Sequence, residues 1–172
     1  MKKNASLRLT IILMLILGAG ILSVLHAAEL DRTAIKVTAS VWEEKAKGGA
    51  GDFLPKDTLD GDLKTSWRAE DEGVWIQYDL GAAQSLKGVS LAFVKGNERV
   101  YTVDVLVSAT GENDSWTCVL KAVKNSGKSL ELEPFEFETA EQAHYVRIVG
   151  HGNNSAKFPK WCNITEIAFV VQ

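Results

Sequence analysis

An acidic turn at residues 57–66 carries the residue types best suited to hold a metal ion. It reads DTLDGDLKTS. Asp-Gly favours a tight turn, because glycine tolerates positive φ and aspartate hydrogen-bonds to the backbone that follows it. The turn can point the carboxylates of Asp60 and Asp62, nearby carbonyls and the Thr65 hydroxyl inward, and Ca²⁺ prefers such oxygen ligands. The sequence departs from the EF-hand pattern, so an ordinary solvated turn stays open as the alternative.

A glutamate near the C-terminus breaks the apolar pattern of its strand. Residues 164–171 read ITEIAFVV, and the two-residue period of a strand places Glu166 on the face of Ile164 and Ala168. A buried carboxylate without a partner is costly. Either this face is solvated near the start of the strand, or a positive group meets Glu166. A cation shared with Asp60 would satisfy it.

The elements that must position these residues are predicted to be β-strands. Alternation with a period of two recurs, punctuated by Gly, Asn and Asp. About eight short strands with frequent turn signals indicate an all-β sandwich. The expected strands cover residues 35–41, 74–80, 89–94, 102–108, 116–120, 134–137, 145–149 and 164–171. Three tryptophans within or beside the expected strands, Trp67, Trp75 and Trp116, are predicted to be core residues.

The first 28 residues are predicted to be a secretory signal peptide. Three basic residues precede an almost wholly apolar stretch at residues 9–24, and the small residues Ala27 and Ala28 follow, which is the pattern of a cleaved export signal. The alternative is an uncleaved membrane anchor, which needs an apolar run of about 20 residues. We therefore expect a secreted or periplasmic protein with no membrane insertion after cleavage and one domain at residues 29–172.

The charge balance argues against nucleic acids and anionic membranes as partners. The sequence has 19 Lys+Arg and 22 Asp+Glu, a net charge of −3. Removing the three basic residues of the signal peptide makes the net charge about −6, which repels polyanions. An acidic partner must therefore be held by a local basic patch.

Two cysteines, Cys118 and Cys162, follow the signal peptide. In an oxidising compartment an isolated pair often forms a disulfide. Buried free thiols are the alternative, because cysteine also behaves as a small apolar residue. The sequence does not fix the distance between the two residues, so both interpretations stay open.

Several short motifs, in this order, resemble a known domain family. The motifs are LDGDLKTSW at residues 59–67, VWIQYDLG at 74–81, YVRIVGHGN at 145–153 and ITEI at 164–167. They are similar to the discoidin, or coagulation factor 5/8 type C, domain. More closely, the chain resembles the family 32 carbohydrate-binding modules of bacterial polysaccharide lyases, notably alginate lyases. The resemblance covers about residues 35–171 and implies an eight-stranded jelly-roll β-sandwich of the galactose-binding-like type.

The resemblance also implies a structural Ca²⁺. In similar modules the ion is held by the acidic turn and by a glutamate on the last strand. Carried over to this sequence, the ligands are the carbonyls of Asp57 and Asp62 and the side chains of Asp60, Thr65 and Glu166. The ion would join the turn to the final strand and would have no catalytic role.

The sugar site that the resemblance implies lies on loops at one end of the sandwich. The matching loop residues are Lys95, Asn97 and Arg99, joined by Trp42, His151, Asn153, Phe158 and Trp161. Such a site combines planar donors for hydroxyls or carboxylates with an aromatic face for the sugar ring. Lys95 and Arg99 could instead be solvated edge charges, and His151 a turn residue. The chain also lacks the longer loop with a Pro-Arg pair that commoner family members carry at Lys95.

The sequence favours a non-catalytic module that binds a polysaccharide, such as an alginate-like polymer of uronic acids. Lys95 and Arg99 would pair with its carboxylates. An adhesion domain for a protein or cell surface is one alternative, and a small polysaccharide-degrading enzyme is another. No motif joins a nucleophile to a base, which disfavours an enzyme. A separate polysaccharide-degrading enzyme is an expected partner, because binding modules usually bring an enzyme to its substrate.

Overall fold

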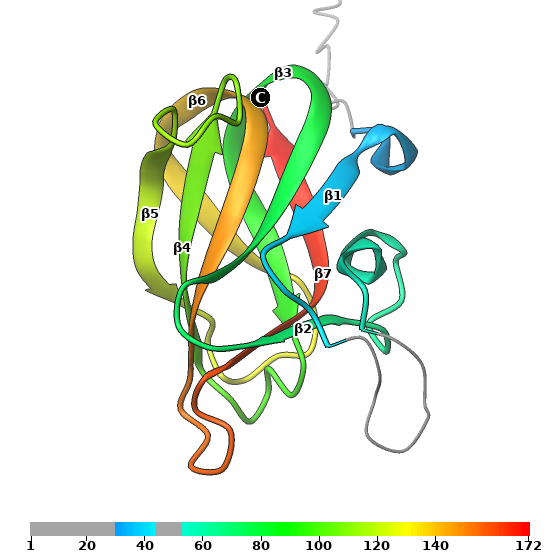
Figure 1. Ribbon diagram of the computed structural model, residues 1–172, viewed down its shortest axis with the longest axis vertical. Coiled ribbons are helices and arrows are strands. Elements are labelled where there is room, and N and C mark those ends of the chain that lie inside the picture. The colour runs from blue at the N-terminus through cyan, green and yellow to red at the C-terminus, as the bar shows by residue number, and fades with distance from the viewer. Residues whose placement is uncertain (1–29, 44–52) are drawn as a thin grey trace, which may run out of the picture.

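A computed structural model describes residues 30–43 and 53–172 of the chain, and the predicted signal peptide, residues 1–28, lies outside these ranges. The described residues form seven β-strands and two short 3₁₀ helices (Figure 1). In chain order they are η1 (Arg32–Ala34), β1 (Lys36–Ala39), η2 (Pro55–Leu59), β2 (Trp67–Glu70), β3 (Val74–Phe93), β4 (Tyr101–Ser108), β5 (Thr117–Lys124), β6 (Glu133–Asn153) and β7 (Trp161–Val171). Neither helix in this part of the chain is long and apolar enough to cross a membrane.

The strands form an antiparallel sandwich of two layers. The two long strands, β3 and β6, contribute one half to each layer. The pairing of β3 with β6 shifts register after Asp79 and again after Leu86. The first half of β3 pairs with β1 and the end of β6, and its second half pairs with β7 and the start of β6. One layer therefore has the order β1-β3-β6-β4-β5, and the other has the order β6-β3-β7-β2 (Figure 1).

The predicted all-β sandwich is confirmed, although its strands are divided differently. The expected strands at residues 74–80 and 89–94 are the two halves of β3, and those at 134–137 and 145–149 both belong to β6. The strand β2 is not among the predicted ones, since its four residues give too short an alternation to recognise.

The core lies between the two layers. Its largest fully buried side chains include Trp67, Tyr78, Tyr101 and Phe93. The core prediction is confirmed for Trp67 and wrong for Trp75 and Trp116, which are only half-buried. The Cζ of Arg147 lies 4.5 Å from the ring centroid of Trp75 and 4.0 Å from that of Trp116. Stacking on a guanidinium lets both indoles lie on the outer face of the layer, away from the core.

The two cysteines are free thiols in different layers of the sandwich. Cys118 is exposed on β5, and Cys162 is buried on β7. The disulfide that the sequence left open is therefore not formed in this structure. Burial raises the pKa of Cys162 to about 12, so its thiol is protonated and inert.

Candidate functional site

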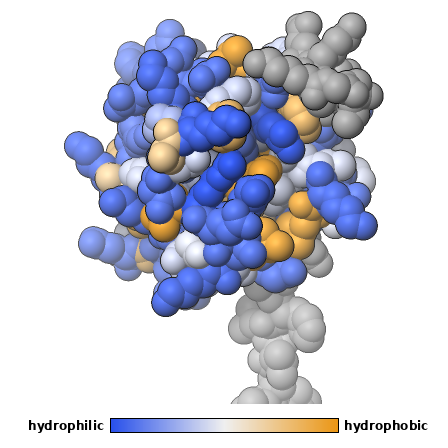
Figure 2. Space-filling view, turned by 90° about the horizontal axis from the view of Figure 1, so that it is seen from below, coloured by the Kyte–Doolittle hydropathy of each residue, from blue (hydrophilic) through white to orange (hydrophobic). Residues whose placement is uncertain are grey.

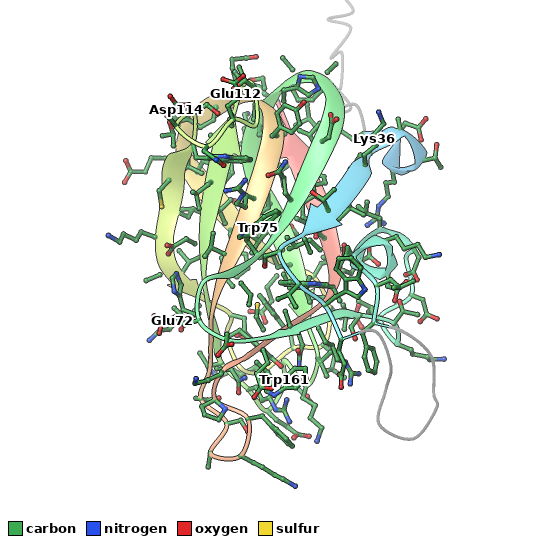
Figure 3. All side chains as sticks on the ribbon, in the orientation of Figure 1. Lys36, Glu72, Trp75, Glu112, Asp114 and Trp161 are labelled. Atoms are coloured by element: carbon green, nitrogen blue, oxygen red, sulfur yellow. The ribbon has the colours of Figure 1, made fainter. Side chains whose placement is uncertain are left out.

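A pocket opens where the loops meet at one end of the sandwich. The turn at residues 94–100 and the loop at 154–160 lie at the lower end in Figure 1, and Figure 3 places the Trp161 side chain there. Figure 2 looks onto this end and shows small apolar patches among hydrophilic residues. The pocket has a volume of about 390 Å³. It is lined by Glu43, Phe53, Arg68, Val94, Lys95, Arg99, Phe158, Trp161 and Asn163.

The turn after β3 positions Lys95 and Arg99. Lys95 has a φ of 54°, and its carbonyl accepts the amide of Arg99 at 2.8 Å. The buried side chain of Asn125 fixes this turn, because its amide donates to the carbonyls of Gly96 and Arg99 at 3.1 and 3.0 Å. A Cβ on Gly96 would lie 2.5 Å from the Ser129 carbonyl oxygen, so the turn requires glycine there. The backbone that carries Lys95 and Arg99 is therefore fixed by hydrogen bonds and close packing.

The strand pair β2–β7 supplies another wall of the pocket. Arg68 on β2 lies opposite Asn163 on β7. The amide of Glu43 donates to the Arg68 carbonyl at 2.9 Å, and the amide of Phe53 donates to the Glu43 carbonyl at 3.2 Å. Asn163 is only 5% exposed, and its Oδ1 accepts no hydrogen bond from the described residues. A buried acceptor left without a partner in this way is uncommon in proteins.

The loop between β6 and β7 carries the aromatic side of the pocket. The side-chain amide of Asn153 donates to the carbonyls of Phe158 and Trp161 at 2.9 and 2.8 Å. Gly152 has a φ of 85°, and a Cβ on it would lie 2.1 Å from the Pro159 carbonyl oxygen. This tight closure presents the exposed ring of Phe158 beside the half-buried ring of Trp161.

The pocket is electropositive. The described lining residues include three cationic side chains, Arg68, Lys95 and Arg99, and one carboxylate, Glu43. The exposed Lys95 ammonium also lies 3.3 Å from the carboxylate of Glu98, outside the lining. Burial lowers the pKa of Arg68, nearby Glu43 opposes this, and the charge of Arg99 adds to it. Arginine side chains are cationic at ordinary pH, so like charges repel here and a bound anion would relieve the repulsion. The pocket is thus suited to a carboxylate or another planar anion.

The structure brings together only some of the residues predicted to bind the ligand. Lys95, Arg99, Phe158 and Trp161 line the pocket. Asn153 instead holds the loop in place, as described above.

The remaining three predicted ligand residues lie elsewhere. Trp42 lines a separate hollow beside Leu54 and Pro55. Asn97 is exposed and is not among the lining residues of the pocket. His151 contacts two carboxylates and does not line the pocket: its Nε2 lies 3.0 Å from Asp104, and its Nδ1 lies 3.9 Å from Glu72.

Sequence reasoning missed Arg68, Phe53, Glu43 and Asn163. Arg68 directly follows a motif used for the resemblance, and an arginine next to a buried tryptophan was the available signal. Its role depends on β2 pairing with β7, which no local pattern shows. The Cζ of Arg68 lies 3.6 Å from the ring centroid of Phe53, a contact between residues far apart in the sequence.

The acidic turn crowds oxygen atoms around Thr65. Its Oγ1 lies 2.9 and 3.0 Å from the two carboxylate oxygens of Asp60, 2.8 Å from the Asp62 carbonyl and 3.3 Å from the Asp57 carbonyl. One hydroxyl hydrogen cannot serve all these acceptors. In the described ranges no three His, Cys, Asp or Glu side chains form a metal cluster. The donors here are instead mainly carbonyl and hydroxyl oxygens, which together with Asp60 fit a hard cation.

Glu166 lies beside this turn and is only 3% exposed. Its carboxylate pairs with Arg32, and its Oε2 accepts the Gly61 amide at 2.9 Å. Burial raises the pKa of Glu166, while Arg32 lowers it. The prediction that Glu166 shares a face with Ile164 is wrong: Ile164 and Ile167 both enter the core, because the register of β3 and β7 shifts between them. Glu166 is thereby turned toward η1, and the positive group that meets it is Arg32.

Comparisons with known proteins agree with this fold. The model of the F5/8 type C domain matches residues 36–167. The family 32 carbohydrate-binding module (CBM32) of AlyQ, in complex with 4,5-unsaturated mannuronic acid, is 34% identical with a TM-score of 0.67, covering 78% of this chain and 92% of that one. A pectin-binding carbohydrate-binding module is 29% identical with a TM-score of 0.67, covering 78% and 88%.

A more distant structure shows the fold alone. It is the module CpGH89CBM32-5 of Clostridium perfringens, in complex with GalNAc-β-1,3-galactose, which is 18% identical with a TM-score of 0.65 and coverage of 83% and 99%. No curated protein matches the sequence.

The β-sandwich with its loop-end pocket defines the chain as a carbohydrate-binding module by fold. The family model and the AlyQ module show that it belongs to the F5/8 type C domain family and is of the CBM32 type.

Proposed function

We propose that this module binds an acidic polysaccharide, such as an alginate-like polymer of uronic acids. The observation that carries the proposal is the gathering of Arg68, Lys95 and Arg99 around one pocket, in a protein whose net charge is −3. Guanidiniums bind carboxylates through paired hydrogen bonds. Phe158 and Trp161 offer aromatic faces to the apolar side of a sugar ring. Together these groups suit a sugar that carries a carboxylate.

The ligands of two relatives support an acidic sugar. The AlyQ module is bound to 4,5-unsaturated mannuronic acid, and a second relative binds pectin. Both ligands contain uronic acids. We infer the same class of sugar for this chain, since its pocket has the matching charge.

Affinity electrophoresis in gels that contain alginate or polygalacturonate tests the proposal. We expect retardation that is lost when the polymer's carboxyl groups are reduced to neutral alcohols. The variant Arg99→Ala should move freely, and added salt should weaken binding because the partners are oppositely charged. Equal retardation by acidic and reduced polymers would contradict an acidic ligand.

We propose that binding occurs without cleavage. Glu43 is the one carboxylate among the described lining residues of the pocket, whereas glycosidases use two carboxylates on either side of the scissile bond. A reducing-end assay on the same polymers checks this, and any turnover by the purified protein would contradict it. An adhesion domain for a protein or cell surface is the second alternative from the sequence, and no observation on the pocket favours it.

We further propose that the acidic turn holds a structural Ca²⁺ and that the protein is exported. The oxygens around Thr65, from Asp57, Asp60 and Asp62, support the ion. Glu166 contacts the same turn through Gly61. The predicted signal peptide supports export to the periplasm or the medium. There the module would partner a separate polysaccharide-degrading enzyme.

A further inference from the structure

A second hollow lies directly beside the pocket. It has a volume of about 290 Å³ and shares Arg68, Val94 and Lys95 with the first. The two hollows are therefore neighbouring parts of one groove, with the shared cationic side chains between them. The aromatic rings lie at one end of this groove. The second hollow is also lined by Lys64 from the acidic turn, by the carboxylate residue Glu131 and by Leu130, which is 48% exposed.

Each hollow is lined by one buried polar residue of β7. Asn163 lines the first and Thr165 lines the second. They are 5% and 4% exposed, and neither the Asn163 Oδ1 nor the Thr165 Oγ1 has a hydrogen-bond partner among the described residues. Leaving a buried polar group unpaired costs stability. Both oxygens are almost closed to solvent, so a ligand hydroxyl would reach either one only after its side chain turned toward the hollow that it lines.

The register of the sheet explains how Thr165 reaches the second hollow. Ala92 pairs with Glu166 and Phe93 pairs with Ile164, so Thr165 has no partner on β3. Such a bulge re-aims a side chain and occurs often beside binding sites. Asn163 and Thr165 thus line two neighbouring hollows from the same strand.

We propose that the second hollow is a second sugar subsite, so that the module binds at least two consecutive residues of an acidic chain. The proposal rests on the proposed function, because it assigns the same ligand class to the groove. One uronate residue would lie in the pocket, between Arg99 and the aromatic rings. The next would lie over Lys95 with a hydroxyl on Thr165 and its carboxylate toward the exposed ammonium of Lys64.

Calorimetric titration with mono-, di- and trisaccharides of mannuronate and galacturonate tests the subsite. We expect the disaccharide of the preferred series to bind at least tenfold more tightly than the monosaccharide. Thr165→Val and Lys64→Ala should each reduce this ratio severalfold and leave monosaccharide affinity unchanged. Lys64 is exposed, so Lys64→Ala keeps the test valid even if Thr165→Val folds poorly. Lys87→Ala, an exposed lysine of β3 outside both hollows, is the matched control.

The outcomes separate the two proposals. Equal affinity for one and two sugars, or a ratio unchanged by both variants, would overturn the second subsite while leaving the first pocket in place. Arg99→Ala should weaken mono- and disaccharide alike, because it acts in the first pocket. If no uronate of any length binds, the proposed function fails and the subsite fails with it.

Discussion

The guanidinium carbon of Arg68 lies 3.6 Å from the centroid of the Phe53 ring. This stacking holds a half-buried arginine in the wall of the pocket, where its remaining donors can face a ligand. Its Nε also donates to the Ser66 hydroxyl at 3.0 Å. The side chain is therefore pre-ordered before any sugar arrives, and ordering it on binding costs little entropy.

Arg68→Ala should weaken uronate binding by about 1.5–3 kcal/mol, the range for a hydrogen bond to a charged group. Arg68→Lys should recover only part of this loss, since lysine keeps the charge and lacks the planar pair of donors. Calorimetry against an oligouronate measures both. Lys121→Ala, an exposed lysine of β5, is the control. Full recovery by lysine would show that charge alone matters at this position.

Phe158→Ala should weaken binding by about 1–2 kcal/mol, because it removes an apolar face of the pocket. The ring is 39% exposed, so the melting temperature should hardly change. Trp42→Ala serves as the control, since Trp42 is similarly exposed, at 38%, and lines a different hollow. If Trp42→Ala weakened binding and Phe158→Ala did not, the sugar would lie in the other hollow.

Local patterns predicted the strands, while the site depends on pairings that local patterns do not contain. Alternation marked most strands, because inward and outward side chains differ in polarity. The acidic turn was recognisable because its Asp-Gly dipeptide and its oxygen-bearing residues are close together in the sequence. Arg68 could not be assigned to the pocket, since its neighbour Asn163 comes from a strand that is distant in sequence. Arg32 was missed as the partner of Glu166, because the bulge in β7 reverses the face that the two-residue period indicates.

Removing divalent ions should lower the stability of the protein. Chelation by EDTA should reduce the melting temperature, and Ca²⁺ at 100 times its Kd should restore about 2.7 kcal/mol. Asp60→Ala should abolish the response to Ca²⁺, because Asp60 supplies two of the oxygens around Thr65. Asp114→Ala is the control, since the exposed Asp114 lies at the upper end of the sandwich in Figure 3, away from the acidic turn. Identical melting curves in EDTA and Ca²⁺ would argue against a structural ion.

The two thiols should differ sharply in reactivity. Cys118 is exposed, whereas Cys162 is fully buried. A thiol-specific chromogenic reagent should therefore label one cysteine in the native protein and both in guanidinium chloride. Cys118→Ser should leave no reactive thiol in the native state. If denatured, unreduced protein showed no free thiol, the two cysteines would be joined by a disulfide after all.

Alkaline pH should destabilise the fold through Cys162. Burial raises its pKa from 9.0 to about 12, so between these values the folded state binds a proton that the unfolded state has released. The contribution of this thiol is fully present below pH 9 and is lost as the pH rises toward 12, by at most about 1.4 kcal/mol per pH unit. Cys162→Ala should lower stability at every pH, because it leaves a small void, but its decline between pH 9 and 10.5 should be shallower than that of the wild-type protein. Urea unfolding at several pH values measures this difference, and parallel declines in the two proteins would show that other groups cause the alkaline loss.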